Sequence, residues 1–225
     1  MDTIKRINYT YNLDCFEGFK LLEPNSIDTV FTSLPYNRKR NDKYANYNDS
    51  VDWLSLLNRT LENSYRVLKP NGYVFFNIQK NYYNKVDYYK FLGQHAKEIV
   101  QTIVWGKTNP MPASGKNITN SYEVFVVLNQ KGKSLKAQHT YTKNIFFTNV
   151  NSNNKYSKIH KAVMNIDACR KVFGNFIGNN KLVLDPFMGV GTTGVVCQEF
   201  DCPYLGFEID KEYADISNQR VKETV

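Results

Sequence analysis

A glycine-rich turn near the end of the chain is the first place where residue types and spacing suit chemistry. Gly189, Gly191 and Gly194 satisfy the pattern G-x-G-x-x-G directly after a short apolar run. Glycines at this spacing let the backbone approach a ligand closely, and a following acid can hold the hydroxyls of a ribose. Glu208 stands nineteen residues after Gly189, where such an acid is expected. The pattern predicts a nucleotide-type ligand, and a purely structural glycine turn is the alternative.

Asp185 precedes this turn and bears on which ligand the turn holds. The pyrophosphate of a dinucleotide is anionic, and a carboxylate at the mouth of the turn would repel it. S-adenosylmethionine (SAM) instead carries a sulfonium and an ammonium group, which suit an acidic strand end. We therefore expect SAM as the cofactor. An NAD(P)-dependent oxidoreductase is the alternative that the glycine pattern alone would allow.

A second candidate site is the sequence Ser33-Leu34-Pro35-Tyr36, which ends and follows a β-branched segment typical of a buried strand. Sheets of α/β proteins bind ligands outside the carboxyl ends of their strands, where these four residues would lie. Taken alone, the sequence is typical of an ordinary X-Pro turn at the end of a strand. Its combination with the glycine turn favours the functional interpretation.

The elements that must position these two motifs alternate along the chain. Apolar and β-branched runs predict strands, and apolar residues at helical spacing predict helices. The expected strands are 26–33, 72–78, 99–105, 122–128, 181–184 and 204–209, and the expected helices are 51–68, 88–98, 166–177 and 192–199. This alternation predicts one α/β domain over residues 1–225, around a mostly parallel central sheet. Because few residues follow the glycine turn, the other strands must come from upstream, and we expect a circularly permuted order.

The composition indicates a globular protein that favours polyanionic partners. Hydrophobic residues make up 42% of the 225 residues and charged residues 22%, which excludes wholesale disorder. The net charge of +8 favours polyanionic partners, although many basic proteins do not bind nucleic acid and the charge alone leaves both alternatives open. We expect a cytoplasmic protein, since no apolar run is long enough to span a bilayer and no secretory signal is recognisable. The cysteine and histidine spacings favour neither a disulfide framework nor a metal site, and no metal is expected.

Two basic segments are candidates for contact with a polyanion. Arg38, Lys39, Arg40 and Lys43 closely follow Tyr36, and residues 129–158 contain scattered lysines without a sustained period. For the first segment, phosphate contacts are preferred over a solvated face because it adjoins the candidate site. For residues 129–158, a solvated excursion and a polyanion-contacting segment stay open as alternatives.

Together, these motifs resemble those of the permuted (β-group) DNA amino-methyltransferases, which methylate N4 of cytosine or N6 of adenine. The segment from Asp185 to Thr193 is similar to the family's SAM-binding motif, and Ser33-Leu34-Pro35-Tyr36 is similar to its catalytic motif, (Ser/Asp/Asn)-Pro-Pro-(Tyr/Phe). The resemblance implies a single Rossmann-like, SAM-dependent methyltransferase domain. It implies catalytic roles for Ser33, Leu34, Pro35 and Tyr36, and cofactor contacts for Asp14, Cys15, Asp185, Pro186, Phe187, Gly189, Gly191, Thr192, Thr193 and Glu208.

Leu34 departs from the family pattern, which usually has proline at this position. By resemblance, the Ser33 side chain and the backbone carbonyl of residue 34 accept the two N–H bonds of the target amine. Leucine supplies that carbonyl as well as proline does, so we expect activity. Tyr36 is expected to stack on the target base, which has to be flipped out of the duplex. Ser33 favours cytosine N4 over adenine N6, although a neutral acceptor could serve either amine.

The resemblance also implies partners. The substrate would be double-stranded DNA, contacted by Arg38, Lys39, Arg40 and Lys43, and residues 129–158 would form a short basic target-recognition insertion. The expected setting is a bacterial or viral restriction-modification system. A cognate restriction endonuclease and a second copy of the chain, as a homodimer, are further candidate partners. The alternative is a catalytically silent DNA-binding or specificity subunit with the same fold, for which Leu34 is the only encouragement.

Overall fold

The computed structural model describes residues 4, 6–35, 52–150, 155–160 and 162–224. Within these residues, eight strands form one sheet in the order β1-β8-β7-β2-β3-β5-β4-β6. The strands are β1 (Tyr9–Asn12), β2 (Ile27–Ser33), β3 (Leu68–Ile78), β4 (Ile99–Lys107), β5 (Tyr122–Leu128), β6 (Ile145–Thr148), β7 (Val183–Asp185) and β8 (Tyr204–Glu208). β5 is antiparallel to its neighbours β3 and β4, whereas the other paired strands are parallel. The expected α/β domain with a mostly parallel sheet is therefore confirmed.

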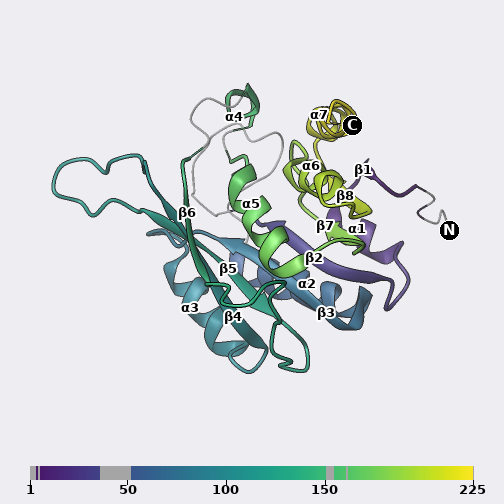
Figure 1. The fold of residues 1–225 in the computed structure, drawn as a ribbon, viewed down its shortest axis with the longest axis horizontal. Coiled ribbons are helices and arrows are strands. Elements are labelled where there is room, and N and C mark those ends of the chain that lie inside the picture. The colour runs from purple at the N-terminus through teal and green to yellow at the C-terminus, as the bar shows by residue number, and fades with distance from the viewer. Residues whose placement is uncertain (1–3, 5, 36–51, 151–154, 161, 225) are drawn as a thin grey trace.

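Helices cover both faces of this sheet (Figure 1). The core on one face includes residues of α1 (Cys15–Lys20), α2 (Trp53–Val67) and α3 (Lys85–Gln94). The core on the other face includes residues of α5 (Ile166–Val172), the π-helix η1 (Phe173–Ile177), α6 (Thr192–Glu199) and α7 (Lys211–Lys222). The short helix α4 (Lys155–Ile159) has no buried residue. None of the helices in the described ranges is both long and apolar enough to cross a membrane.

The structure departs from the expected elements in a few places. The helix expected at 166–177 is α-helical only to Val172, because its last turn widens into η1 before Gly178 ends it with φ of +78°. Residues 129–158 show no sustained period in the sequence and no strand was expected there, yet β6 lies within them. β6 is a four-residue edge strand with alternate residues exposed, so it has no run of buried apolar residues to identify it. β1, α1, α4 and α7 were not predicted either; the first three are short, whereas α7 has twelve residues.

The strand order brings the two candidate motifs together. β7 leads into the glycine turn and lies beside β2, which ends at Ser33. Because β2, β3, β7 and β8 are parallel, their carboxyl ends meet at one edge of the sheet. At this edge Ser33 is the register partner of Asn77 on β3, and Asp185 is the partner of Gly206 on β8. The last β-α-β segment of the chain therefore lies between β1 and β2 in the sheet, and the circularly permuted order stays a prediction.

Candidate active site

A cavity of about 510 Å³ lies at this carboxyl edge. Its volume is within the range of small-molecule sites, which is roughly 300–1,000 Å³. Residues of both candidate motifs line it, together with the start of α1. The predicted site residues on its wall are Asp14, Cys15, Ser33, Leu34, Pro35, Pro186, Phe187, Gly189, Thr192 and Glu208. The fold thus assembles one site from three distant parts of the sequence.

Glu208 is held at the end of β8 by the backbone. Its Oε2 accepts a hydrogen bond from the Gly189 N–H at 2.8 Å, and its Oε1 accepts one from the Asp210 N–H at 2.9 Å. Burial raises the pKa of Glu208 above its usual value, and these two hydrogen bonds oppose the rise only in part. A carboxylate has about four acceptor positions, so two backbone bonds leave capacity for a ribose hydroxyl. The geometry suits the role expected from the sequence.

The sequence suggests that Asp185 lies at the mouth of the glycine turn, but the structure buries it elsewhere. It is only 1% exposed, is not part of the cavity wall, and lies beneath the glycine turn. Its carboxylate accepts hydrogen bonds from the Thr32 hydroxyl at 2.6 Å, the Thr193 hydroxyl at 2.5 Å and the Phe187 N–H at 3.0 Å. Burial raises the pKa of Asp185 to about 6, although the three hydrogen bonds oppose the shift. Asp185 and Thr193 therefore fasten β2, β7 and α6 together.

Gly191 also supports the turn rather than lining the cavity. It precedes α6 with φ of +83°, a conformation that favours glycine. A Cβ atom at this position would lie 2.4 Å from Ser217 Oγ on α7. Gly189, with φ of +53°, is different, because the nearest atom to its added Cβ is His160 Nε2 at 3.7 Å. Only Gly189 of this pair lies on the cavity wall.

Arg220 holds the turn from α7 and was not predicted from the sequence. It is 6% exposed, and its guanidinium donates to the Val190 carbonyl at 3.0 Å and to Thr192 Oγ1 at 3.1 Å. Burial lowers the pKa of Arg220. Helical periodicity does not distinguish an arginine that reaches inward from one that reaches into solvent, so the sequence carried no signal for this contact.

Hydrogen bonds to other elements hold the described part of the Ser33 loop. The Ser33 hydroxyl donates to Oδ1 of Asn77 at 3.1 Å, and the Trp53 indole N–H donates to the Pro35 carbonyl at 2.6 Å. The Leu34 side chain is 2% exposed and packs into the core on the α1–α3 face. Tyr36, together with Arg38, Lys39, Arg40 and Lys43, lies outside the described residues.

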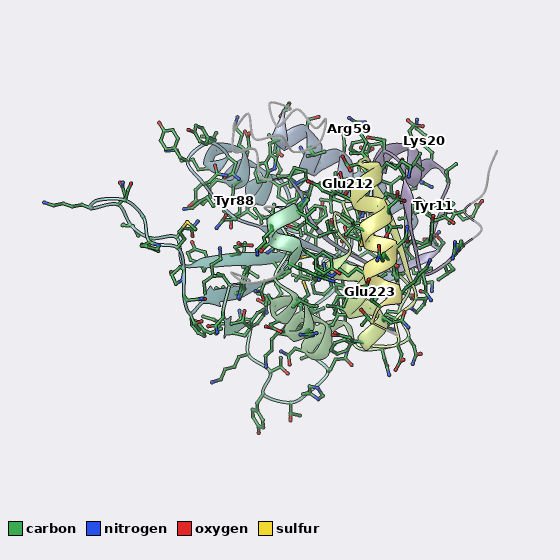
Figure 2. All side chains as sticks on the ribbon, turned by 90° about the horizontal axis from the view of Figure 1, so that it is seen from above. Tyr11, Lys20, Arg59, Tyr88, Glu212 and Glu223 are labelled. Atoms are coloured by element: carbon green, nitrogen blue, oxygen red, sulfur yellow. The ribbon has the colours of Figure 1, made fainter. Side chains whose placement is uncertain are left out.

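Aromatic rings and charges outside the predicted set also line the cavity. Phe16 packs under Arg59, whose Cζ lies 3.9 Å from the ring centroid. In Figure 2, Arg59 lies toward the same side of the molecule as Glu212, which is in the first turn of α7. His160 and Tyr213, which also line the cavity, make an edge-on contact with ring centroids 4.8 Å apart. Burial lowers the pKa of His160, which favours its neutral form.

The charges of the cavity wall fit SAM better than a dinucleotide. Among the described residues, the wall carries Asp14, Glu17, Glu208 and Asp210 but only one arginine or lysine, Arg59. An acidic wall favours a ligand with sulfonium and ammonium groups and disfavours a pyrophosphate. The expected preference for SAM is thus supported by wall residues other than Asp185.

Comparisons with known sequences give methyltransferases over nearly the whole chain. Type II methyltransferase M.HinfI of Haemophilus influenzae is 24% identical over 93% of this chain and 67% of its own length. Type II methyltransferase M2.DpnII of Streptococcus pneumoniae is 26% identical over 93% of this chain and 87% of its own length.

Solved structures share the fold. A PvuII DNA methyltransferase described as cytosine-N4-specific has a TM-score of 0.78 at 16% identity, covering 99% of this chain and 95% of its own. The M1.HpyAVI-SAM complex has a TM-score of 0.69 at 22% identity, covering 94% of this chain and 98% of its own. The family model described as DNA methylase matches residues 27–219. The chain that builds this acidic cavity therefore belongs to the DNA methylase family, whose members are SAM-dependent methyltransferases.

Proposed function

We propose that this protein methylates an exocyclic amine of a base flipped out of double-stranded DNA, with cytosine N4 favoured over adenine N6. The observation that carries the proposal is the shared cavity: Ser33, Leu34 and Pro35 line the same wall as Gly189 and Glu208. A methyl donor held at Glu208 would then lie beside the acceptors of the Ser33 loop. The serine is the basis for favouring cytosine, because it resembles the cytosine subgroup.

The residues of the loop would make the amine a better nucleophile. The lone pair of an exocyclic amine is delocalised into its ring, so acceptors at its two N–H bonds shift electron density onto nitrogen. Ser33 Oγ and the carbonyl of Leu34 are the acceptors. When bound, SAM supplies the methyl group, whose bond to sulfur breaks as the bond to the amine nitrogen forms. The amine afterwards releases one proton to solvent.

The buried Leu34 side chain supports activity despite the missing proline. The side chain packs into the core, and the acceptor needed from this residue is its backbone carbonyl, which does not depend on the side chain. Pro35 still favours an extended conformation at residue 34.

Tyr36 would stack on the target base, and Arg38, Lys39, Arg40 and Lys43 would hold phosphates. Residues 129–158, including β6, would recognise the target, and a cognate endonuclease and homodimer formation stay predictions.

The test is to incubate the protein with duplex DNA and isotope-labelled SAM, digest the DNA to nucleosides and identify the product by mass spectrometry. N4-methylcytosine is the expected product. N6-methyladenine would retain the reaction class but overturn the preference for cytosine. If SAM and DNA both bind and no methylated nucleoside forms, the silent DNA-binding subunit becomes the correct interpretation.

A further inference from the structure

Ser33 can act as an acceptor for the amine only if its own proton points elsewhere. A serine hydroxyl has one proton and two lone pairs, and its rotation about the Cβ–Oγ bond is otherwise free. If the proton pointed into the cavity, it would face the N–H bonds of the substrate. Some neighbouring group therefore has to take this proton in a hydrogen bond.

Asn77 provides that group. It is the register partner of Ser33 on the adjacent parallel strand, and its Oδ1 accepts the Ser33 hydroxyl at 3.1 Å. Asn77 is 1% exposed and interrupts the apolar sequence of β3, Tyr73 to Ile78. A polar side chain in such a place loses its hydration, so its hydrogen bonds have to be made within the protein.

The orientation of the Asn77 amide is itself set by the next strand. Its Nδ2 donates to the Val124 carbonyl of β5 at 3.4 Å, which turns Oδ1 toward Ser33. In the reversed orientation, the amide would present N–H groups to Ser33, which would occupy one Oγ lone pair and leave the Ser33 proton without this acceptor. The pairing of β3 with β5 thus influences the orientation of the Ser33 hydroxyl through the Asn77 side chain.

We propose that Asn77 is a positioning residue that holds the Ser33 proton away from the cavity and directs an Oγ lone pair toward the target amine. This inference rests on the function proposed above. The amide is neutral and only accepts a hydrogen bond, so no proton is transferred to it. Asn77 acts through Ser33 and not on the substrate.

A double-mutant cycle on methylation turnover tests this role. Ser33→Ala should lower kcat about a hundredfold, the size seen when one preorganised hydrogen-bonding group is removed. Asn77→Ala should lower kcat about tenfold, which corresponds to a modest loss of orientation. Both variants should keep their SAM dissociation constants. In the Ser33→Ala background, Asn77→Ala should have no further effect, because no hydroxyl is left to orient.

Three further variants separate positioning from folding. Asn77→Asp keeps an acceptor oxygen and should restore most of the turnover. Asn77→Val suits a buried strand and replaces Asn77→Ala in the cycle if the alanine variant does not fold. Asn84→Ala removes another fully buried asparagine, which bonds to Gln79 and Asn81 in the loop after β3, and should leave kcat unchanged.

The outcomes distinguish this inference from the proposed function. If the wild-type protein methylates DNA but Asn77→Ala slows the Ser33→Ala variant as much as it slows the wild type, Asn77 is structural and the inference is overturned. If the wild-type protein forms no methylated nucleoside, the proposed function fails first, and the positioning role fails with it.

Discussion

Asp185 makes the stability of this protein depend on pH in a direction opposite to that of an ion-paired carboxylate. Burial raises its pKa from 3.8 to about 6, so the folded state holds the proton more tightly than the unfolded state. The stabilisation from protonated Asp185 is fully present below the unfolded pKa and is lost as the pH rises through about 6. Asp185→Asn mimics the protonated group at every pH. Relative to the wild type, its free energy of unfolding should increase by about 2 kcal/mol between about pH 4.5 and 7.5.

Urea unfolding of both proteins at a series of pH values checks this expectation. The difference between the two is the quantity of interest, because Glu208 has a raised pKa as well and shifts the wild-type curve in the same direction. Glu208→Gln should leave the contribution of Asp185 in place. A difference between wild type and Asp185→Asn that stays constant with pH would contradict the assigned burial effect.

The Trp53 indole ties the reacting loop to the start of α2. Trp53→Phe keeps an aromatic ring in a site that is 2% exposed and removes the donor to the Pro35 carbonyl. The stability loss should be roughly 1 to 3 kcal/mol, because one hydrogen bond is lost and the smaller ring leaves a cavity. The turnover number should fall several-fold, roughly as expected for less exact placement of the Ser33 and Leu34 acceptors. Tyr65→Phe is the control. It removes the hydroxyl that donates to Glu98 at 3.2 Å, and because neither Tyr65 nor Glu98 lines the cavity, the turnover number should not change.

The glycine turn is stabilised from α7, and its two left-handed glycines should respond differently to alanine. Gly191→Ala places Cβ against Ser217 at φ of +83°, so strain and overpacking together should cost roughly 2 to 5 kcal/mol. Gly189→Ala has room for Cβ, so the backbone strain alone should cost about 1 to 2 kcal/mol. Because Gly189 lies on the cavity wall, this variant should weaken SAM binding more than its stability loss explains. Chemical denaturation and calorimetric SAM titration measure the two effects.

Sequence patterns predicted the buried elements well and the side-chain contacts at the site poorly. β2 and β5 have long buried runs, and both lie within one residue of their expected bounds. β6 has no such run because it is an exposed edge strand. The glycine spacing identified the turn, but only the packing of α7 reveals that Gly191 contacts Ser217 whereas Gly189 lies on the cavity wall. Asn77 has no sequence signal of its own, since its role depends on the pairing of β3 with both β2 and β5.

The chain has a net charge of +8, yet the charged residues on the described wall of its cavity are mainly acidic. These two facts suit different ligands, because the cavity would hold a cationic cofactor while basic residues outside it hold a polyanion. Binding of duplex DNA should therefore weaken with salt as counterions are taken up again. If Arg38, Lys39, Arg40 and Lys43 contact phosphates, replacing all four by alanine should reduce the slope of log K against log salt concentration by about 3 to 4.

A second set of four substitutions separates local contacts from net charge. Lys20, Lys171 and Lys222 lie in the last turns of α1, α5 and α7, and Lys69 lies near the amino end of β3, so all four are away from the carboxyl edge of the sheet. Their replacement by alanine removes the same formal charge. Fluorescence anisotropy with one labelled duplex should give a nearly unchanged slope for this control set. Equal slopes for the two sets would mean that DNA responds to overall charge, and the assignment of phosphate contacts to residues 38–43 would be wrong.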